Sequence, residues 1–214
     1  MPDAATRLHT IRSAVADAAR VGRREQSEVT IVAVSKNRSA EAIEELLVAG
    51  QRHFGENRVQ EAQTKWPALK ARYPDVVLHM IGQLQSNKAE DAAALFDVIH
   101  SLDRPSLGAA LVKAGWRGPT YVQVNIGEEE QKGGVAIAEL PTFLADMRAR
   151  GLTIAGLMAI PPSEVEASPY FALLAKLARR HDVSGLSMGM SSDFRSAVML
   201  GATVVRIGTA FFEE

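Results

Sequence analysis

The chain has 214 residues, of which 47% are hydrophobic and 23% are charged, and its formal net charge is −1. This composition is typical of a globular protein, and it lacks the clustered Lys and Arg that a dedicated nucleic-acid-binding protein needs. The chain contains no cysteine, which excludes disulfides, thiolate nucleophiles and zinc sites built on cysteine.

The first 22 residues do not resemble a targeting segment. Charged residues interrupt them, and they contain no continuous apolar run of the kind that a signal peptide needs. No other stretch approaches the ~20 apolar residues required to cross a bilayer. We therefore expect a cytoplasmic protein that does not enter membranes.

The predicted elements begin with an amphipathic helix. Leu8, Ile11, Val15 and Ala19 fall on one face of it, and Gly22 marks its end. After this helix, short apolar runs with strand character alternate with helical segments. The eight runs cover residues 29–35, 52–55, 76–81, 97–101, 120–126, 153–159, 184–188 and 203–207.

The segments between these runs carry signals for helix starts and stops. Short polar side chains can cap a helix N-terminus, and a glycine commonly ends one. The expected capping residues and terminal glycines are, in chain order, Ser39, Gly50, Asp103, Gly115, Gly151 and Ser168.

Eight strands that alternate with helices predict an α/β fold with a parallel sheet, and eight is the number of strands that closes a (β/α)₈ (TIM) barrel. No linker rich in Ser or Gly divides the chain, so we expect residues 1–214 to form a single domain. The segment after the eighth strand is too short for a full closing helix. The N-terminal helix is the natural candidate to cover this part of the barrel wall.

In such a barrel, chemistry takes place at the carboxyl ends of the strands. Lys36 follows the first strand directly. A lysine in that place is often only a solvated charge. Apolar walls at a barrel mouth would instead favour the neutral amine, which is nucleophilic and can form a Schiff base with a carbonyl compound.

The loops after the seventh and eighth strands have the composition of a phosphate site. Ser187, Gly189, Ser191 and Ser192 lie between the seventh strand and a short predicted helix, and Gly208 and Thr209 follow the eighth strand. Barrels of this kind commonly bind phosphate with these two loops, because glycine permits close backbone approach and a helix start offers N–H groups.

Arg206 lies inside the eighth strand among apolar residues. A buried arginine must be paired with a carboxylate or must donate to something bound, and the sequence leaves both interpretations open. A Schiff-base lysine, a phosphate loop and a buried arginine together match the aldehyde, the phosphate and the ring nitrogen of pyridoxal 5′-phosphate.

A family likeness rests on the same residues. Seven segments in chain order, VAVSK, FGENRVQE, HMIGQLQSNK, HSLDR, GLMAIPP, LSMGMSSDF and VRIGTAFF, resemble the YggS/PROSC family of pyridoxal-phosphate-binding proteins. The resemblance spans nearly the whole chain. It implies a fold like the barrel domain of alanine racemase, which is the fold type III architecture of pyridoxal phosphate proteins.

The resemblance also implies roles for individual residues. Lys36 would hold the cofactor as a Schiff base, and Arg206 would face its ring nitrogen. The residues implied around the phosphate are Ser187, Ser191, Gly208 and Thr209. The other residues expected at the cofactor are Asn57, His79, Met158 and Gly189.

The family is regarded as serving vitamin B6 homeostasis. The resemblance therefore implies a protein that holds pyridoxal phosphate with little or no turnover, passes it to apoenzymes and acts as a monomer. An arginine opposite the ring nitrogen disfavours protonation of that nitrogen, so carbanions are stabilised less. A racemase with such an arginine needs a well-placed acid, and we expect none of Tyr73, Tyr121 and Tyr170 at the barrel mouth.

Other functions stay open from the sequence. The chain could be a racemase or a related fold type III enzyme that is completed by dimerisation. An aldolase without cofactor would use the same lysine on a sugar phosphate. An interaction scaffold with a vestigial site would be colourless and would not take up pyridoxal phosphate.

Three histidines on the second, third and fourth strands raise the question of a metal site. His53, His79 and His100 lie at different distances from their strand ends, and no carboxylate ligand is evident beside them. We therefore expect structural histidines, or histidines that flank the cofactor, and no bound metal.

Overall fold

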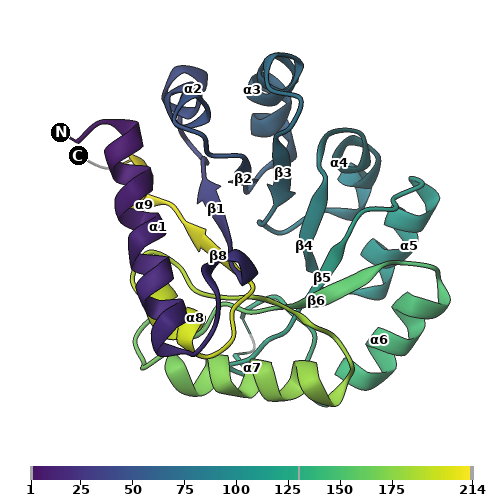
Figure 1. Cartoon of the computed structure of the whole chain (residues 1–214). Helices are drawn as coiled ribbons and strands as arrows, with labels where there is room; N and C mark the ends of the chain where they lie inside the picture. The colour runs from purple at the N-terminus through teal and green to yellow at the C-terminus, as the bar shows by residue number, and fades with distance from the viewer. Residues whose placement is uncertain (1, 130, 213–214) are drawn as a thin grey trace.

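The computed structural model describes residues 2–129 and 131–212. Met1, Glu130, Glu213 and Glu214, which belong to the predicted domain, lie outside the described residues. Eight parallel strands close into a barrel in the order β1 to β8, with β8 paired to β1 (Figure 1). The strands are β1 Thr30–Val34, β2 His53–Glu56, β3 Val77–Met80, β4 Val98–Leu102, β5 Thr120–Gln123, β6 Ile154–Met158, β7 Gly185–Ser187 and β8 Val204–Ile207.

All eight predicted strands are present, and the (β/α)₈ fold is confirmed. Helices surround the barrel and alternate with its strands (Figure 1). They are α1 Ala4–Val21, α2 Ala40–Val48, α3 Val59–Arg72, α4 Ala89–Leu95, α5 Pro105–Lys113, α6 Leu140–Ala149, α7 Ser168–Arg180, α8 Phe194–Met199 and α9 Thr209–Phe212, with short 3₁₀ turns η1 Gln26–Glu28 and η2 Ser86–Lys88.

The N-terminal helix covers the barrel wall where the chain ends. α1 packs against α8 and α9, and both chain ends lie on that side (Figure 1). Its predicted apolar face is buried, since Leu8, Ile11 and Val15 are each at most 4% exposed. The α1 helix thus takes the place of the full closing helix that α9, with four residues, cannot provide.

Two predicted helix caps are wrong. The N-cap position of α5 is Arg104, and Asp103 instead forms an ion pair with that arginine at 2.6 Å. The N-cap of α7 is Ala167, while Ser168 is the first helical residue and donates its hydroxyl to Glu166. A local sequence pattern locates these helix starts only to within a residue or two, because a neighbouring charge can compete for the capping side chain. The cap at Ser39 is confirmed, because its hydroxyl accepts from the Ala42 N–H.

Alternation along the strands separates an outer core from the barrel interior. Outward residues pack against the helices, and a smaller cluster inside the barrel contains Val32, Val98, Tyr121, Met158 and Val204. Successive side chains of a strand point to opposite faces. Polar residues two positions beyond these apolar ones therefore also point inward, nearer the carboxyl ends of the strands. None of the helices in the described ranges is long and apolar enough to cross a membrane.

Candidate functional site at the barrel mouth

A cavity of about 670 Å³ lies at the carboxyl ends of β1 and β8, next to the loop that follows β7. Its walls carry a lysine, two arginines, hydroxyl groups and a glycine. The lining residues are Val34, Lys36, Asn37, Arg38, Met190, Ser191, Ser192, Arg206, Gly208 and Thr209. This is the end of the barrel at which the fold places its chemistry.

Lys36 stands on the wall of the cavity, in the loop between β1 and α2. Its side chain is exposed, so the expected enclosure by apolar walls is wrong: β1 ends at Val34, and the chain rises above the packed interior before it reaches the lysine. The next residue, Asn37, adopts a left-handed backbone with φ of 57°. Asparagine tolerates this conformation better than most residues, and it lets the chain turn sharply behind the lysine.

A buried ion-pair cluster holds the base of the Lys36 loop. The Lys65 ammonium on α3 lies 2.8 Å from the carboxylates of Glu56 and Glu61, and it donates to the Ser35 carbonyl at 3.0 Å. The Ser35 hydroxyl donates to Glu56 at 2.7 Å, and the Asn37 N–H donates to Glu61. The residues on both sides of Lys36 are therefore tied to α3.

Arg206 projects into the barrel below the cavity and is only 4% exposed. Its guanidinium donates to the Ser187 hydroxyl at 2.6 Å and to the Ala159 carbonyl at 3.0 Å. Burial lowers the pKa of Arg206 to about 10, although the charge of Asp193 acts in the opposite direction. Among the described residues, no carboxylate lies within ion-pair distance of this arginine.

The partners of Arg206 decide between the two interpretations of this side chain. A structural salt bridge would place a carboxylate against the guanidinium, and the described residues supply only neutral oxygens. A buried cation without an ionic partner is costly unless something else neutralises it or accepts its hydrogen bonds. The geometry therefore favours an arginine that donates to a bound ligand.

The loops after β7 and β8 are tied together at the cavity. The Ser191 hydroxyl accepts from the Gly208 N–H at 3.2 Å, and the Gly189 carbonyl accepts from the Arg206 N–H at 2.9 Å. Gly189 has φ of 93°, and a Cβ there would lie 2.6 Å from the Ala197 Cβ. At Gly208 a Cβ would meet its nearest atom at 3.5 Å. Gly189 is thus needed by the loop itself, whereas Gly208 leaves backbone open toward the cavity.

Five of the ten predicted cofactor residues line the cavity: Lys36, Ser191, Arg206, Gly208 and Thr209. The other five lie beneath it or beside it: Asn57, His79, Met158, Ser187 and Gly189. Met158 packs in the interior cluster, and the backbone of Asn57 packs against Gly82. The Ser187 hydroxyl bonds with Arg206 and His100, and its expected contact with phosphate stays a prediction.

Several cavity residues were not predicted as cofactor residues. Asn37 and Arg38 directly follow Lys36, and Met190 flanks Ser191, whereas Ser192 was already placed in the loop expected to bind phosphate. Their position next to predicted residues was the available signal. Arg38 adds a third cation, which stacks over the Phe212 ring at 5.4 Å from its centroid.

The three histidines contact one another in sequence and do not converge on one point. His53 and His79 are 3.0 Å apart between ring nitrogens, and His79 and His100 are 2.9 Å apart. Within the described ranges, no group of three His, Asp or Glu residues is arranged to hold a metal ion. The tyrosines also lie away from the cavity: Tyr121 is inside the barrel, and Tyr73 and Tyr170 are on the helical layer.

The chain matches a known protein family along most of its length. The family model described as "Alanine racemase, N-terminal domain" matches residues 11–214. A protein from Vibrio cholerae named "Pyridoxal phosphate homeostasis protein" is 40% identical over 89% of this chain and 87% of its own. An Escherichia coli K12 protein of the same name is 37% identical over 99% of this chain and 97% of its own.

The chain belongs to this family of pyridoxal phosphate homeostasis proteins. Among solved structures of the family, PipY of Synechococcus elongatus with pyridoxal phosphate bound is 38% identical. It superposes with a TM-score of 0.83 over 98% of this chain and 99% of its own. Alanine racemase of Corynebacterium glutamicum shares only the fold, with 18% identity and a TM-score of 0.65 over 94% of this chain and 60% of its own.

Proposed function

We propose that this chain binds pyridoxal 5′-phosphate in the mouth cavity and serves the homeostasis of that cofactor, with Lys36 as its covalent attachment point. The observation that carries the proposal is the buried Arg206, whose described partners are all neutral, in the same cavity as Lys36 and two phosphate-type loops. The family names and the PipY structure with bound pyridoxal phosphate support it.

The residues of the cavity suit the three ends of this cofactor. When bound, pyridoxal phosphate supplies an aldehyde carbon, with which the Lys36 amine can condense with loss of water to give a Schiff base. The Ser191 hydroxyl, the Gly208 backbone and Thr209 offer donors for the phosphate. Arg206 offers a donor for the ring nitrogen. Asn57, His79, Met158, Ser187 and Gly189 would support the site from beneath or beside it.

We propose little or no catalytic turnover. Among the described residues that line the cavity, no His, Tyr, Asp or Glu stands beside Lys36 to act as a second acid or base. Racemisation needs both an acid and a base beside the reacting carbon. The fitting role is a cytoplasmic, monomeric carrier that passes the cofactor to apoenzymes.

An absorbance spectrum and chemical trapping test the attachment. We expect wild-type protein loaded with pyridoxal phosphate to show a near-visible band and, after borohydride reduction and digestion, phosphopyridoxyl on the Lys36 peptide. Lys36→Ala should lose both signals but retain weaker binding, because the phosphate contacts remain. Lys113→Ala, at an exposed position at the end of α5, is the matched control. A label on other lysines, with none on Lys36, would overturn the proposal.

The carrier role is tested separately with a racemisation assay on several amino acids. We expect rates far below those of dedicated enzymes. A turnover above ~1 s⁻¹ would favour the racemase instead. Label on Lys36 only after addition of a sugar phosphate would favour an aldolase.

A further inference from the structure

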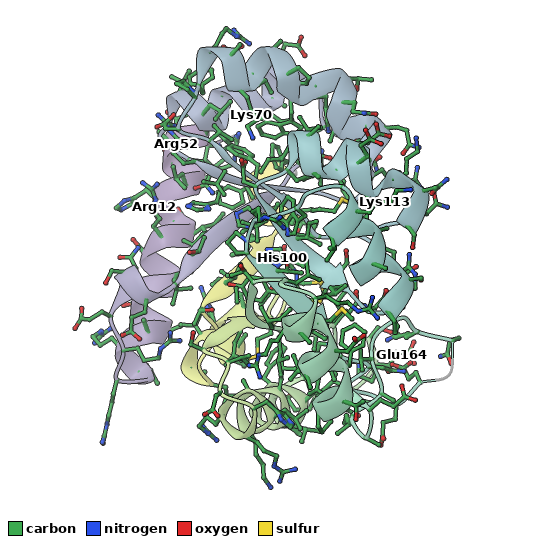
Figure 2. The ribbon with its side chains drawn as sticks, turned by 90° about the vertical axis from the view of Figure 1, so that its right-hand side faces the viewer. Arg12, Arg52, Lys70, His100, Lys113 and Glu164 are labelled. Atoms are coloured by element: carbon green, nitrogen blue, oxygen red, sulfur yellow. The ribbon has the colours of Figure 1, made fainter. Side chains whose placement is uncertain are left out.

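A continuous line of hydrogen bonds crosses the barrel interior from one end to the other. It joins Arg206 to Ser187 at 2.6 Å, Ser187 to His100 at 2.8 Å, His100 to His79 at 2.9 Å and His79 to His53 at 3.0 Å. Figure 2 shows His100 in the middle of the molecule. Four of these five side chains are nearly or fully buried, and His53 alone is partly exposed.

The line ends in a second cavity, far from the barrel mouth. His53 lines a cavity of about 490 Å³ at the N-terminal ends of β1 and β2. Arg12 and Arg52 also line it, and they lie on one side of the molecule, while Glu164 of a mouth loop lies toward the other (Figure 2). The hydrogen-bonded line therefore connects the mouth cavity with the opposite face of the barrel.

The direction of each hydrogen bond follows from Arg206. A guanidinium can only donate, so the Ser187 oxygen accepts from it. The serine hydrogen then needs an acceptor, and the Nδ1 atom of His100 lies 2.8 Å from this hydroxyl oxygen. A buried O–H without an acceptor is costly, so Nδ1 of His100 accepts and its Nε2 carries the proton.

The same reasoning passes along the histidines. Nε2–H of His100 donates to Nδ1 of His79, and Nε2–H of His79 donates to Nδ1 of His53. This order requires neutral rings. Burial lowers the pKa of all three histidines, to about 3 for His79, so the rings stay neutral near pH 7. Each interior imidazole then uses one nitrogen to accept and one to donate.

The charged and titratable neighbours of the line are few. His53 faces Arg12 of α1, Arg52 with its ion-pair partner Asp75, and His79. The ring of Tyr121 stacks on His100 at 4.5 Å between centroids. At the other end, Asp193 is the charge that acts on Arg206. Burial of His53 lowers its pKa and so disfavours a positive charge there.

We propose that His53, His79 and His100 are positioning residues that hold Arg206, through Ser187, as a donor toward the cofactor ring, and that they couple this donor to the opposite face of the barrel. This rests on the proposed function, because it takes Arg206 as the partner of the ring nitrogen. Apolar side chains could fill the same space, but they could not fix the direction of the serine hydroxyl.

Protonation of His53 would change the hydrogen bonds along the line as far as Arg206. A proton added at its Nδ1 would face the Nε2–H of His79, so His79 and His100 must each lose the Nε2 proton and gain one on Nδ1. The line then holds one proton more than before, and the extra positive charge resides on His53. His100 then donates to the Ser187 oxygen, which also accepts from Arg206, and the serine hydrogen turns away from His100. The hydrogen bond between Ser187 and Arg206 therefore changes.

Two measurements on protein loaded with pyridoxal phosphate test this. Nitrogen-15 NMR of labelled histidines at pH 8 should show His79 and His100 protonated on Nε2 and bare on Nδ1. We also expect the pH midpoint of the near-visible band to move by about one pH unit in His100→Phe, the size of change that a lost polar neighbour can produce. His53→Gln should move this pH midpoint in the same direction, and the substitution leaves the buried residues of the barrel interior unchanged. His9→Gln, exposed on α1, should change nothing.

Each outcome separates this inference from the proposed function. Two results would overturn the positioning role alone, provided that the Lys36 label still forms. One is an Nδ1–H tautomer at His79 or His100. The other is a pH midpoint that equals the wild-type value in both His100→Phe and His53→Gln. Failure to trap label on Lys36 in wild type would overturn the proposed function. If His100→Phe does not fold, the NMR tautomers of the wild-type protein and the pH midpoint of His53→Gln still test the positioning role.

Discussion

At the scale of single residues, the mouth cavity depends on charges that are buried around it and beneath it. Arg206 lies under the cavity with neutral partners, and Lys65 lies behind the Lys36 loop between two carboxylates. Glu56 is fully buried, and its Oε2 has no hydrogen-bond partner among the described residues. Its other oxygen receives bonds from Lys65, Ser35 and the Trp66 indole. The α3 helix thus holds the lysine loop through a small set of desolvated contacts.

We expect Lys65→Met to destabilise the protein by about 3–5 kcal/mol, because it leaves the buried Glu56 carboxylate without its cation. Chemical denaturation measures the free energy of unfolding. Lys70→Met is the matched control on the same helix, since its ion pair with Asp97 is more exposed and should contribute at most about 1 kcal/mol. Equal losses in the two variants would contradict a special role for the Glu56 pair.

At the scale of elements, the mouth cavity is formed by the short loops that follow the strands. The loop after β7 turns through the left-handed Gly189 and leads into α8, and the loop after β8 leads into α9. A hydrogen bond from the Gly208 N–H to the Ser191 hydroxyl joins the two loops. The two glycines therefore play different parts, one in the shape of the loop and the other at the cavity surface.

A pair of alanine variants separates these parts. Gly189→Ala should cost about 1–3 kcal/mol or more of stability, because alanine would be strained at positive φ and its Cβ would collide with Ala197. Gly208→Ala should fold normally but lower the affinity for pyridoxal phosphate about tenfold, or about 1.4 kcal/mol, because a methyl group blocks close approach of phosphate. Denaturation and absorbance titration give the two quantities. Normal affinity in Gly208→Ala would place the phosphate elsewhere.

At the scale of the whole molecule, the barrel interior holds both an apolar cluster and a polar line. An apolar cluster around Met158 fills one part, and a line of histidines ends at Arg206. The helices outside are held by apolar packing, with α1 sealing the wall beside α8 and α9. The polar line is therefore enclosed by the fold, and its protonation is linked to global stability.

We expect stability to fall as the pH drops below about 6.5. In the unfolded chain His79 binds a proton near its ordinary pKa of 6.5, whereas burial lowers its native pKa to about 3. The unfolded state therefore gains protons first, and His79 should contribute a loss of about 1.4 kcal/mol per pH unit between these values. Burial lowers the pKa of His100 too, so its loss adds to this one.

Urea denaturation between pH 6 and pH 5 measures this slope. His79→Gln cannot take up a proton and should flatten the slope by about 1.4 kcal/mol per pH unit, whatever its stability at pH 8. His9→Gln, at an exposed position on α1, should leave the slope unchanged. An unaltered slope in His79→Gln would mean that this ring does not stay neutral in the native state.

Much of this architecture was predictable from the sequence. The apolar runs located all eight strands to within a few residues, because a strand in a closed parallel barrel needs a short apolar run and a turn at each end. The face of α1 followed from its helical period. Lys36, Ser191, Arg206, Gly208 and Thr209 were predicted as site residues because they stand at strand ends or interrupt an apolar strand, and these five line the cavity.

The remaining features required the folded structure. The caps expected at Asp103 and Ser168 were wrong by one residue, since neighbouring charges compete for them. The Lys65 cluster and the histidine line join residues that are far apart in the chain.

By itself, the sequence determined which segments form strands and helices and which face of α1 is buried, because apolar runs and helical periodicity are visible along the chain. Only barrel closure and strand register decided that His53, His79, His100, Ser187 and Arg206 meet, because contacts across the interior depend on how eight strands are staggered and no local pattern encodes that stagger.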